Sequence, residues 1–125
     1  MNSRLKKSEP NPIPKEWRMI VCRILHDRGS KGRKNILITE RAKNDWGVAF
    51  PGEYPWDLPA TLEDVLQDDS IQGRCVPDIK PPGEAYEFMF THSGKLMYGK
   101  VNLLTPERKV IVVISAHIPN KGDKL

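Results

Sequence analysis

The sequence predicts an α+β protein, in which N-terminal helices pack on a C-terminal antiparallel β-meander of three or four strands. Two observations support this fold class. Apolar residues near the N-terminus recur with the spacing of an amphipathic helix, whereas residues 84–91, 95–103 and 109–117 have the pattern of three β-strands. The connections between these strands are short, and short connections join antiparallel neighbours.

The 125 residues are expected to form a single domain, residues 15–125, preceded by a flexible tail of residues 1–14. The tail is polar and proline-containing, which favours a mobile or extended chain. The sequence has no run of about 18 apolar residues and no apolar segment after its basic N-terminus, so we expect a cytoplasmic protein without membrane contact. Cys22 and Cys75 are expected to be reduced thiols.

The first helix is expected over residues 15–28. An apolar stripe at helical spacing runs along it, formed by Trp17, Ile20, Val21, Ile24 and Leu25. A basic loop that contains two glycines follows and ends the helix.

Residues 35–39 have the pattern of a short strand or of the beginning of a helix. Thr39 is expected to cap a helix over residues 40–46, which ends at Gly47.

Prolines exclude regular structure from residues 48–58, which are rich in aromatic side chains. These side chains either pack beneath a long loop or form an exposed stacking surface, and packing is favoured because aromatic residues bury large areas. A short helix over residues 59–67 and a further strand near residues 73–77 precede the meander.

Side chains alternate along a strand, so the sequence predicts which residues share a face of the sheet. In the last strand, strict alternation places Ser115 and His117 on the same face as Ile111 and Val113. At one end of the sheet, beyond the elements that pack on it, polar side chains of the last two strands are expected to be exposed. These are Tyr98, Lys100, Asn102, Ser115 and His117.

This polar end is the only place where the sequence indicates chemistry. His117, at the end of an apolar strand, can act as a base near neutral pH or be an ordinary surface residue. Lys100 either faces a ligand or solvent, or protects a sheet edge against aggregation. Because Tyr98 and Ser115 lie close to them on the predicted sheet, the candidate catalytic residues are His117, Lys100, Tyr98 and Ser115.

No metal or cofactor is expected. The three histidines are far apart in the sequence, neither cysteine has a partner at ligand spacing, and the chain contains no HExxH, GxSxG or phosphate-loop motif. The net charge of +4, concentrated in the first 43 residues, favours a polyanionic partner, although a charged surface also serves solubility alone.

The segments YEFMF, GKLMYGKVNL and KVIVVISAH follow the helical part of the chain. In this order of elements, residues 36–117 resemble the small RNase toxins of bacterial toxin–antitoxin systems, which share the barnase–EndoU–colicin–RelE fold. The last two segments are similar to the final core strands of RelE-like toxins. The resemblance implies an endoribonuclease without metal or cofactor that cleaves RNA by attack of the 2′-hydroxyl, and an antitoxin-like protein partner.

The resemblance also implies roles for individual residues. The family's lysine on the penultimate strand corresponds to Lys100, and its tyrosine corresponds to Tyr98 or Tyr86. A histidine that some relatives carry at the end of the final strand corresponds to His117. Lys100, together with Arg108, would stabilise the phosphorane charge, while a tyrosine would stack on a base or donate a proton. The basic residues that would steer RNA are Arg18, Arg23, Arg28, Lys31, Arg33 and Lys34.

Two alternatives remain at the level of the sequence. One is a non-catalytic accessory module of a phage or mobile element, which binds nucleic acid or protein and whose nucleic-acid binding weakens with salt. The other is a protein-binding adaptor that uses the aromatic residues of the 50–58 loop as interface anchors.

Overall fold

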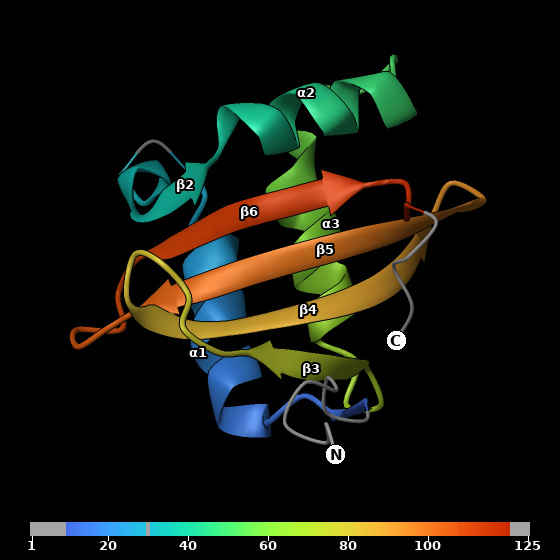
Figure 1. Cartoon of the computed structure of the whole chain (residues 1–125). Coiled ribbons are helices and arrows are strands. Elements are labelled where there is room, and N and C mark those ends of the chain that lie inside the picture. Colours follow the sequence, from blue (N-terminus) through green and yellow to red (C-terminus); the bar gives the residue numbers. More distant parts are fainter. Residues whose placement is uncertain (1–9, 30, 121–125) are drawn as a thin grey trace.

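A six-stranded, mainly antiparallel sheet and three α-helices form the computed structural model, which describes residues 10–29 and 31–120 (Figure 1). The helices are α1 (Lys15–His26), α2 (Glu40–Ala49) and α3 (Asp57–Leu66), and a short 3₁₀ helix η2 (Arg33–Asn35) follows α1. The strands are β1 (Asn11–Pro12), β2 (Ile36–Ile38), β3 (Gln72–Val76), β4 (Gly83–His92), β5 (Lys95–Leu104) and β6 (Ile111–His117).

The predicted class, helices with a mainly antiparallel sheet, is confirmed, but the described sheet has more strands than the three or four expected. The strand order is β1-β3-β4-β5-β6-β2, in which β3 to β6 form an antiparallel meander. The two additional strands lie at the edges, and β2 pairs with β6 in parallel. β1, at two residues, is too short to produce a recognisable alternation of side chains in the sequence. β2 lies within residues 35–39, for which a short strand was one of the two expectations.

The expected tail, residues 1–14, is only partly within the described residues, because residues 1–9 lie outside them. The remaining part is built into the fold. Asn11 and Pro12 pair with β3, and the side chain of Ile13 is buried in the core.

The buried face of α1 and the side-chain cap of α2 account for the positions of these two helices. α1 buries Trp17, Val21 and Leu25, as its periodicity predicts. Thr39 caps α2, with its Oγ1 accepting a hydrogen bond from the backbone N–H of Ala42 at 3.0 Å. The predicted end of α2 at Gly47 is wrong, because the helix continues for two more residues and buries Ala49.

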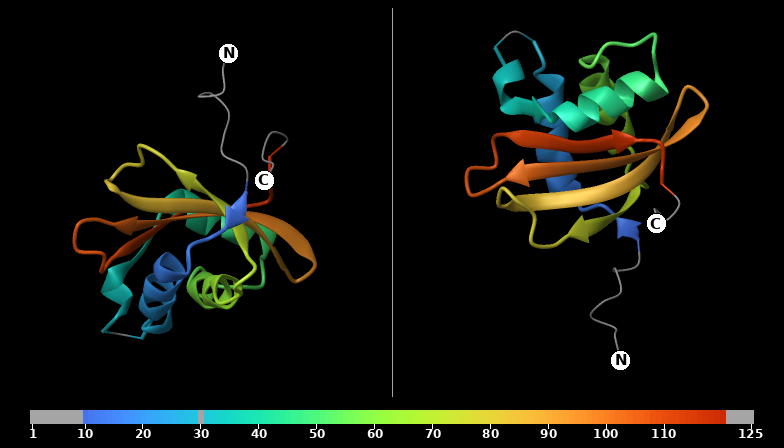
Figure 2. Two further views of the ribbon diagram at one scale, coloured as in Figure 1. Left: turned by 90° about the horizontal axis from the view of Figure 1, so that it is seen from below. Right: turned by 45° about the horizontal axis from the view of Figure 1, so that its top comes forward.

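All the helices pack on one side of the sheet, in one core with β4, β5 and β6. In the left view of Figure 2 the sheet is seen nearly edge-on, with α1 and α3 on the same side of it. α2 lies along β6, and its buried Trp46 is part of the same core. The opposite face of β4, β5 and β6 carries no helix within the described residues, and we call it the open face.

The connections also follow their local sequence. Ser93 and Gly94 join β4 to β5 and have φ angles of 48° and 79°, which is the left-handed geometry that a two-residue hairpin requires. In the loop before α3, Phe50 is buried and Trp56 packs against the core, as expected, whereas Tyr54 is exposed. No helix of the described part is long and apolar enough to cross a membrane.

A β-bulge in β6 changes the predicted faces of the sheet. Lys100 pairs with Ser115, but the next residue of β5, Val101, pairs with Val113, so Ile114 is an additional residue in the ladder. Strict alternation predicted that Ser115 and His117 share a face with Val113. Because of the bulge, they lie on the face opposite to Val113. They lie on the open face, and the sequence pattern alone did not reveal the bulge.

Candidate functional site

Polar side chains gather on the open face because the strand register brings them into rows. Arg74 of β3 pairs with Glu87 of β4, Glu87 pairs with Lys100 of β5, and Lys100 pairs with Ser115 of β6. Directly paired residues of neighbouring strands point to the same face, so these four side chains form one row across the sheet. The adjacent row contains Tyr98 paired with His117. We call these six residues the open-face cluster: Arg74, Glu87, Tyr98, Lys100, Ser115 and His117.

A hydrogen bond between Tyr98 and Glu87 anchors the cluster. The Tyr98 hydroxyl donates to Oε1 of Glu87, and the two residues are 7% and 4% exposed. A buried carboxylate is costly unless it is hydrogen-bonded, so this contact stabilises both side chains in one arrangement. Tyr98 therefore presents a fixed ring to its neighbours on the open face.

His117 is oriented by two contacts. Its imidazole stacks on the ring of Tyr98, with centroids 4.9 Å apart and planes inclined by 23°. Its Nδ1 lies 2.8 Å from the carbonyl oxygen of Ile118. Because a carbonyl can only accept, Nδ1 must carry the proton, and Nε2 of the neutral ring retains its lone pair. The contact thus favours the tautomer in which Nε2 is the base.

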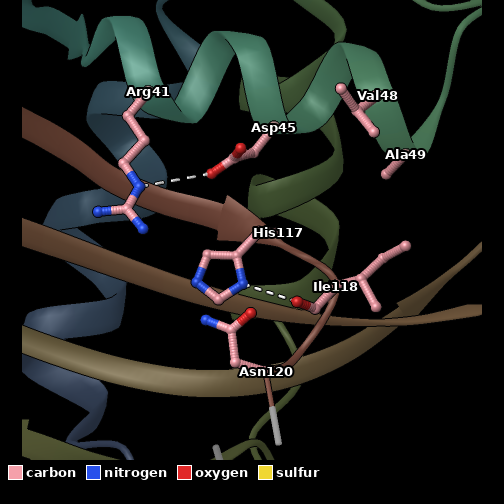
Figure 3. Close-up of a pocket in the computed structure, with 7 residues that line it drawn as sticks. All are labelled: Arg41, Asp45, Val48, Ala49, His117, Ile118 and Asn120. Atoms are coloured by element: carbon pink, nitrogen blue, oxygen red, sulfur yellow. Dashed lines mark hydrogen bonds and ion pairs between the residues drawn. The ribbon is translucent and has the colours of Figure 1, made fainter.

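A pocket of about 240 Å³ opens beside His117, between α2 and the end of β6. Figure 3 shows Arg41 and Asp45 extending from α2 toward the imidazole, with Asn120 on the other side of the ring. The residues that line the pocket are Arg41, Asp45, Val48, Ala49, His117, Ile118 and Asn120.

The structure brings the four predicted catalytic residues together: His117, Lys100, Tyr98 and Ser115 occupy neighbouring positions of one face. Glu87 and Arg74 also belong to the cluster, but the sequence did not predict them as site residues. A signal for Glu87 was present, because it is the only charged residue inside an otherwise apolar and aromatic segment, residues 85–90. The register that places it opposite Lys100 could not be derived from that segment alone. Asn102, expected at the open end, is instead covered, and its Nδ2 donates to the carbonyl oxygen of Pro81 at 2.8 Å.

Tyr86 and Arg108, to which the resemblance also gave roles, lie away from this cluster, and the structure does not bring them together with His117 and Lys100. Tyr86 faces the helices and contacts Trp17 edge-on at 5.0 Å, and burial is the main cause that raises its pKa. Arg108 follows β5 and forms ion pairs with Glu84 at 2.7 Å and with Glu16 at 3.6 Å. Its charge is therefore used to join the sheet to α1.

Arg18, predicted to steer RNA, is a buried structural residue and is 5% exposed. Its guanidinium donates to the carbonyl oxygens of Ile13 and Leu66 at 3.1 and 3.0 Å and to the carboxylate of Asp69 at 2.9 Å. These bonds connect α1 with the segments before it and after α3. Helical periodicity placed Arg18 off the apolar stripe of α1, but α3 packs against that side of the helix and buries the guanidinium.

The other predicted steering residues are not grouped around His117. Arg28 donates to the buried carboxylate of Glu63 at 2.5 Å, so its charge is largely neutralised. Lys31, Arg33 and Lys34 are exposed on and before η2, as is Arg23 on α1. η2 leads into β2, which pairs with the first residues of β6, and the length of β6 separates this region from His117 by about 20 Å.

Replacing Arg18 by alanine is expected to lower the free energy of unfolding by about 2–3 kcal/mol, because the carbonyl groups that it satisfies would lose their buried donor. Urea unfolding followed by circular dichroism measures this effect. Arg23→Ala, an exposed substitution on the same helix, is the control and should change stability by less than about 0.5 kcal/mol. Equal stability of the two variants would contradict the structural role of Arg18.

Cys22 of α1 lies in the helix layer, where its Sγ contacts the carbonyl oxygen of Glu63 at 3.8 Å. Burial raises the pKa of Cys22 to about 11, so its thiol is protonated at neutral pH and is a poor nucleophile. Within residues 10–29 and 31–120, no group of three or more histidine, cysteine, aspartate or glutamate side chains is placed to hold a metal ion.

Comparison of the chain with models of protein families, with curated proteins and with solved structures gave no match in any of the three cases.

Proposed function

We propose that the protein is a metal-independent endoribonuclease that cleaves RNA through attack of a 2′-hydroxyl on the adjacent phosphorus. The observation that carries this proposal is the arrangement of His117. The imidazole is partly exposed, its Nδ1 is hydrogen-bonded to a carbonyl oxygen, and its face stacks on Tyr98. Nε2 is thereby available as a proton acceptor, close to the row of side chains that contains Lys100.

In the proposed reaction, Nε2 of His117 accepts the proton of the 2′-hydroxyl. The 2′-oxygen forms a bond to phosphorus, the bond from phosphorus to the 5′-oxygen breaks, and the 5′-oxygen takes up a proton. The products are a 2′,3′-cyclic phosphate and a 5′-hydroxyl end, and no electron acceptor or metal is needed for this balance.

Lys100 is suited to stabilise the charge that develops on the phosphorane. Its side chain is half-buried on the open face and makes no ion pair or hydrogen bond with any residue of the described part. A partly desolvated ammonium that has no protein partner favours an anionic ligand. Lys100 also supplies a proton donor for the leaving 5′-oxygen.

Tyr98 and Glu87 act as positioning residues in this proposal. Glu87 fixes the Tyr98 hydroxyl, and the Tyr98 ring in turn supports the imidazole of His117. Arg74 completes the row next to Glu87 and contributes positive charge to the face that RNA would contact.

The fold adds support from the resemblance to RelE-like toxins. Helices cover one face of the β3 to β6 meander, and the open face carries Tyr98, Lys100 and His117, three of the residues to which the resemblance gave roles. A toxin of this kind would be controlled by an antitoxin-like protein partner, and the cytoplasm would be its place of action.

The test is incubation of the purified protein with total RNA in the presence of EDTA, followed by analysis of the fragment ends. Cleavage that leaves 2′,3′-cyclic phosphates is expected. RNA that carries 2′-O-methyl groups is the matched substrate control and should remain intact, because it lacks the attacking hydroxyl. Cleavage of the methylated RNA, or no cleavage of either substrate by folded protein, would contradict the proposal.

A second candidate function rests on the exposed basic residues near η2. Arg33 lies over the ring of Trp56 at 4.4 Å from its centroid, with Lys31 and Lys34 exposed beside it. A cation held on an aromatic ring among lysines suits a binding surface for nucleic acid without catalysis. This function predicts RNA binding that weakens steeply with salt and yields no cleavage product.

A further inference from the structure

The pocket beside His117 has the position of a base-binding subsite, if the proposed ribonuclease function is correct. A ribose whose 2′-hydroxyl is held at Nε2 of His117 must place its own base within one sugar ring of the imidazole. His117 itself forms part of the pocket wall, so the pocket lies within this reach. Its volume of about 240 Å³ is below that of a site for a drug-sized ligand, roughly 300–1,000 Å³, and suits a single planar base.

Asp45 is the polar group of the pocket that lacks good partners. Its side chain is 34% exposed, and its only partner in the described part of the chain is Nε of Arg41, 3.8 Å from Oδ2. This distance is too long for a hydrogen bond. A carboxylate that has lost part of its water without gaining a hydrogen bond is stabilised by a ligand that donates to it.

The chemistry of the four bases decides which ligand suits a carboxylate. Guanine carries two adjacent donors, N1–H and the N2 amino group, on one edge, which matches the two oxygens of a carboxylate. Adenine and cytosine place an acceptor next to their amino group, and uracil flanks its single N–H with carbonyl oxygens. Each of these three bases would direct a lone pair at Asp45, and such a repulsive contact is a source of specificity.

Arg41 and the apolar wall complete the match. The Arg41 guanidinium is 81% exposed at the mouth of the pocket and can only donate, as the O6 and N7 acceptors of guanine require. Val48 and Ile118 are exposed apolar side chains on opposite elements of the pocket, and they offer surfaces for the faces of a base.

From these contacts we infer that the pocket between α2 and the end of β6 binds guanine, with Asp45 accepting from N1–H and N2–H and Arg41 donating to O6 or N7. The inference deepens the proposed function, because it assigns a preference for cleavage after guanosine to the site that His117 serves.

Binding of the four nucleoside 3′-monophosphates, measured by calorimetry, tests the inference without depending on cleavage. Guanosine 3′-monophosphate is expected to bind about 10- to 100-fold more tightly than the other three. Asp45→Asn, which keeps the size of the side chain but replaces an acceptor by a donor, should abolish this preference. Asp64→Asn, an exposed substitution on α3, is the control and should leave the preference unchanged.

Equal affinity for all four nucleotides, or an unchanged preference in the Asp45→Asn variant, would overturn the inference. Cleavage of chimeric DNA that contains a single ribonucleotide then separates the inference from the proposed function. Selective binding of guanosine 3′-monophosphate without cleavage of any chimera would contradict the ribonuclease proposal and leave the guanine site standing. Cleavage of all four chimeras at equal rates would retain the ribonuclease and remove the guanine preference.

Discussion

Replacing His117 by alanine is expected to reduce the rate of RNA cleavage by about 10²- to 10⁴-fold, which is the usual contribution of a general base. The substitution removes Nε2, the proton acceptor whose tautomer is set by the bond from Nδ1 to Ile118. His117 lies at the end of β6 and is partly exposed, so the fold should persist without it. The measurement is the initial rate of cleavage of a defined RNA in EDTA, together with a circular dichroism spectrum.

His26→Ala is the matched control for this experiment. His26 also contacts a polar partner through Nδ1, which lies 2.8 Å from Glu63, but it belongs to the helix layer and not to the open face. Its replacement should leave the cleavage rate unchanged. Wild-type turnover by folded His117→Ala protein would remove His117 from the mechanism and favour the binding function near η2.

Replacing Trp46 by alanine is expected to lower the free energy of unfolding by about 3–5 kcal/mol, the range for deletion of a large buried aromatic side chain. Trp46 is completely buried and contacts Phe50 at 4.5 Å and His92 at 5.3 Å between ring centroids. It thereby connects α2 to the hairpin between β4 and β5. Urea unfolding monitored by circular dichroism measures the loss.

Trp56→Ala provides the control, because Trp56 is only partly buried and the Arg33 guanidinium lies over its ring. Its replacement should cost clearly less than that of Trp46. The Trp46 variant should also lose any preference for guanosine 3′-monophosphate, because α2 carries Arg41 and Asp45 on the helix that Trp46 holds in place. Equal unfolding midpoints for wild type and Trp46→Ala would contradict this account of the core.

Local sequence patterns were sufficient to predict α1, the beginning of α2 and the hairpin between β4 and β5. The apolar stripe with Trp17, Val21 and Leu25 specified α1, since one face of a helix repeats every three to four residues. Thr39 specified the beginning of α2 through its side-chain oxygen, and Gly94 specified the hairpin through its positive φ. The alternation in β5 likewise placed Tyr98 and Lys100 on one face, so half of the candidate catalytic set was correctly grouped.

The candidate site as a whole required information that no single segment contains. Glu87 reaches Tyr98 only because the register of β4 and β5 brings them together, and Asp45 reaches the neighbourhood of His117 only because α2 packs along β6. The position of Arg18 in the core could likewise not be predicted locally, because two of its three partners, Leu66 and Asp69, are about fifty residues away in the sequence.

The sequence by itself therefore determined the fold class, the main helices and the meander, because periodicity, capping and turn geometry depend on residues within about one turn or one hairpin of each other. Only the tertiary structure decided which polar residues meet. The additional residue Ile114 in β6 turns Ser115 and His117 to the open face, and a ladder can accept such a bulge only in the presence of its neighbouring strand. Packing across the sheet, and not local pattern, assembled the site.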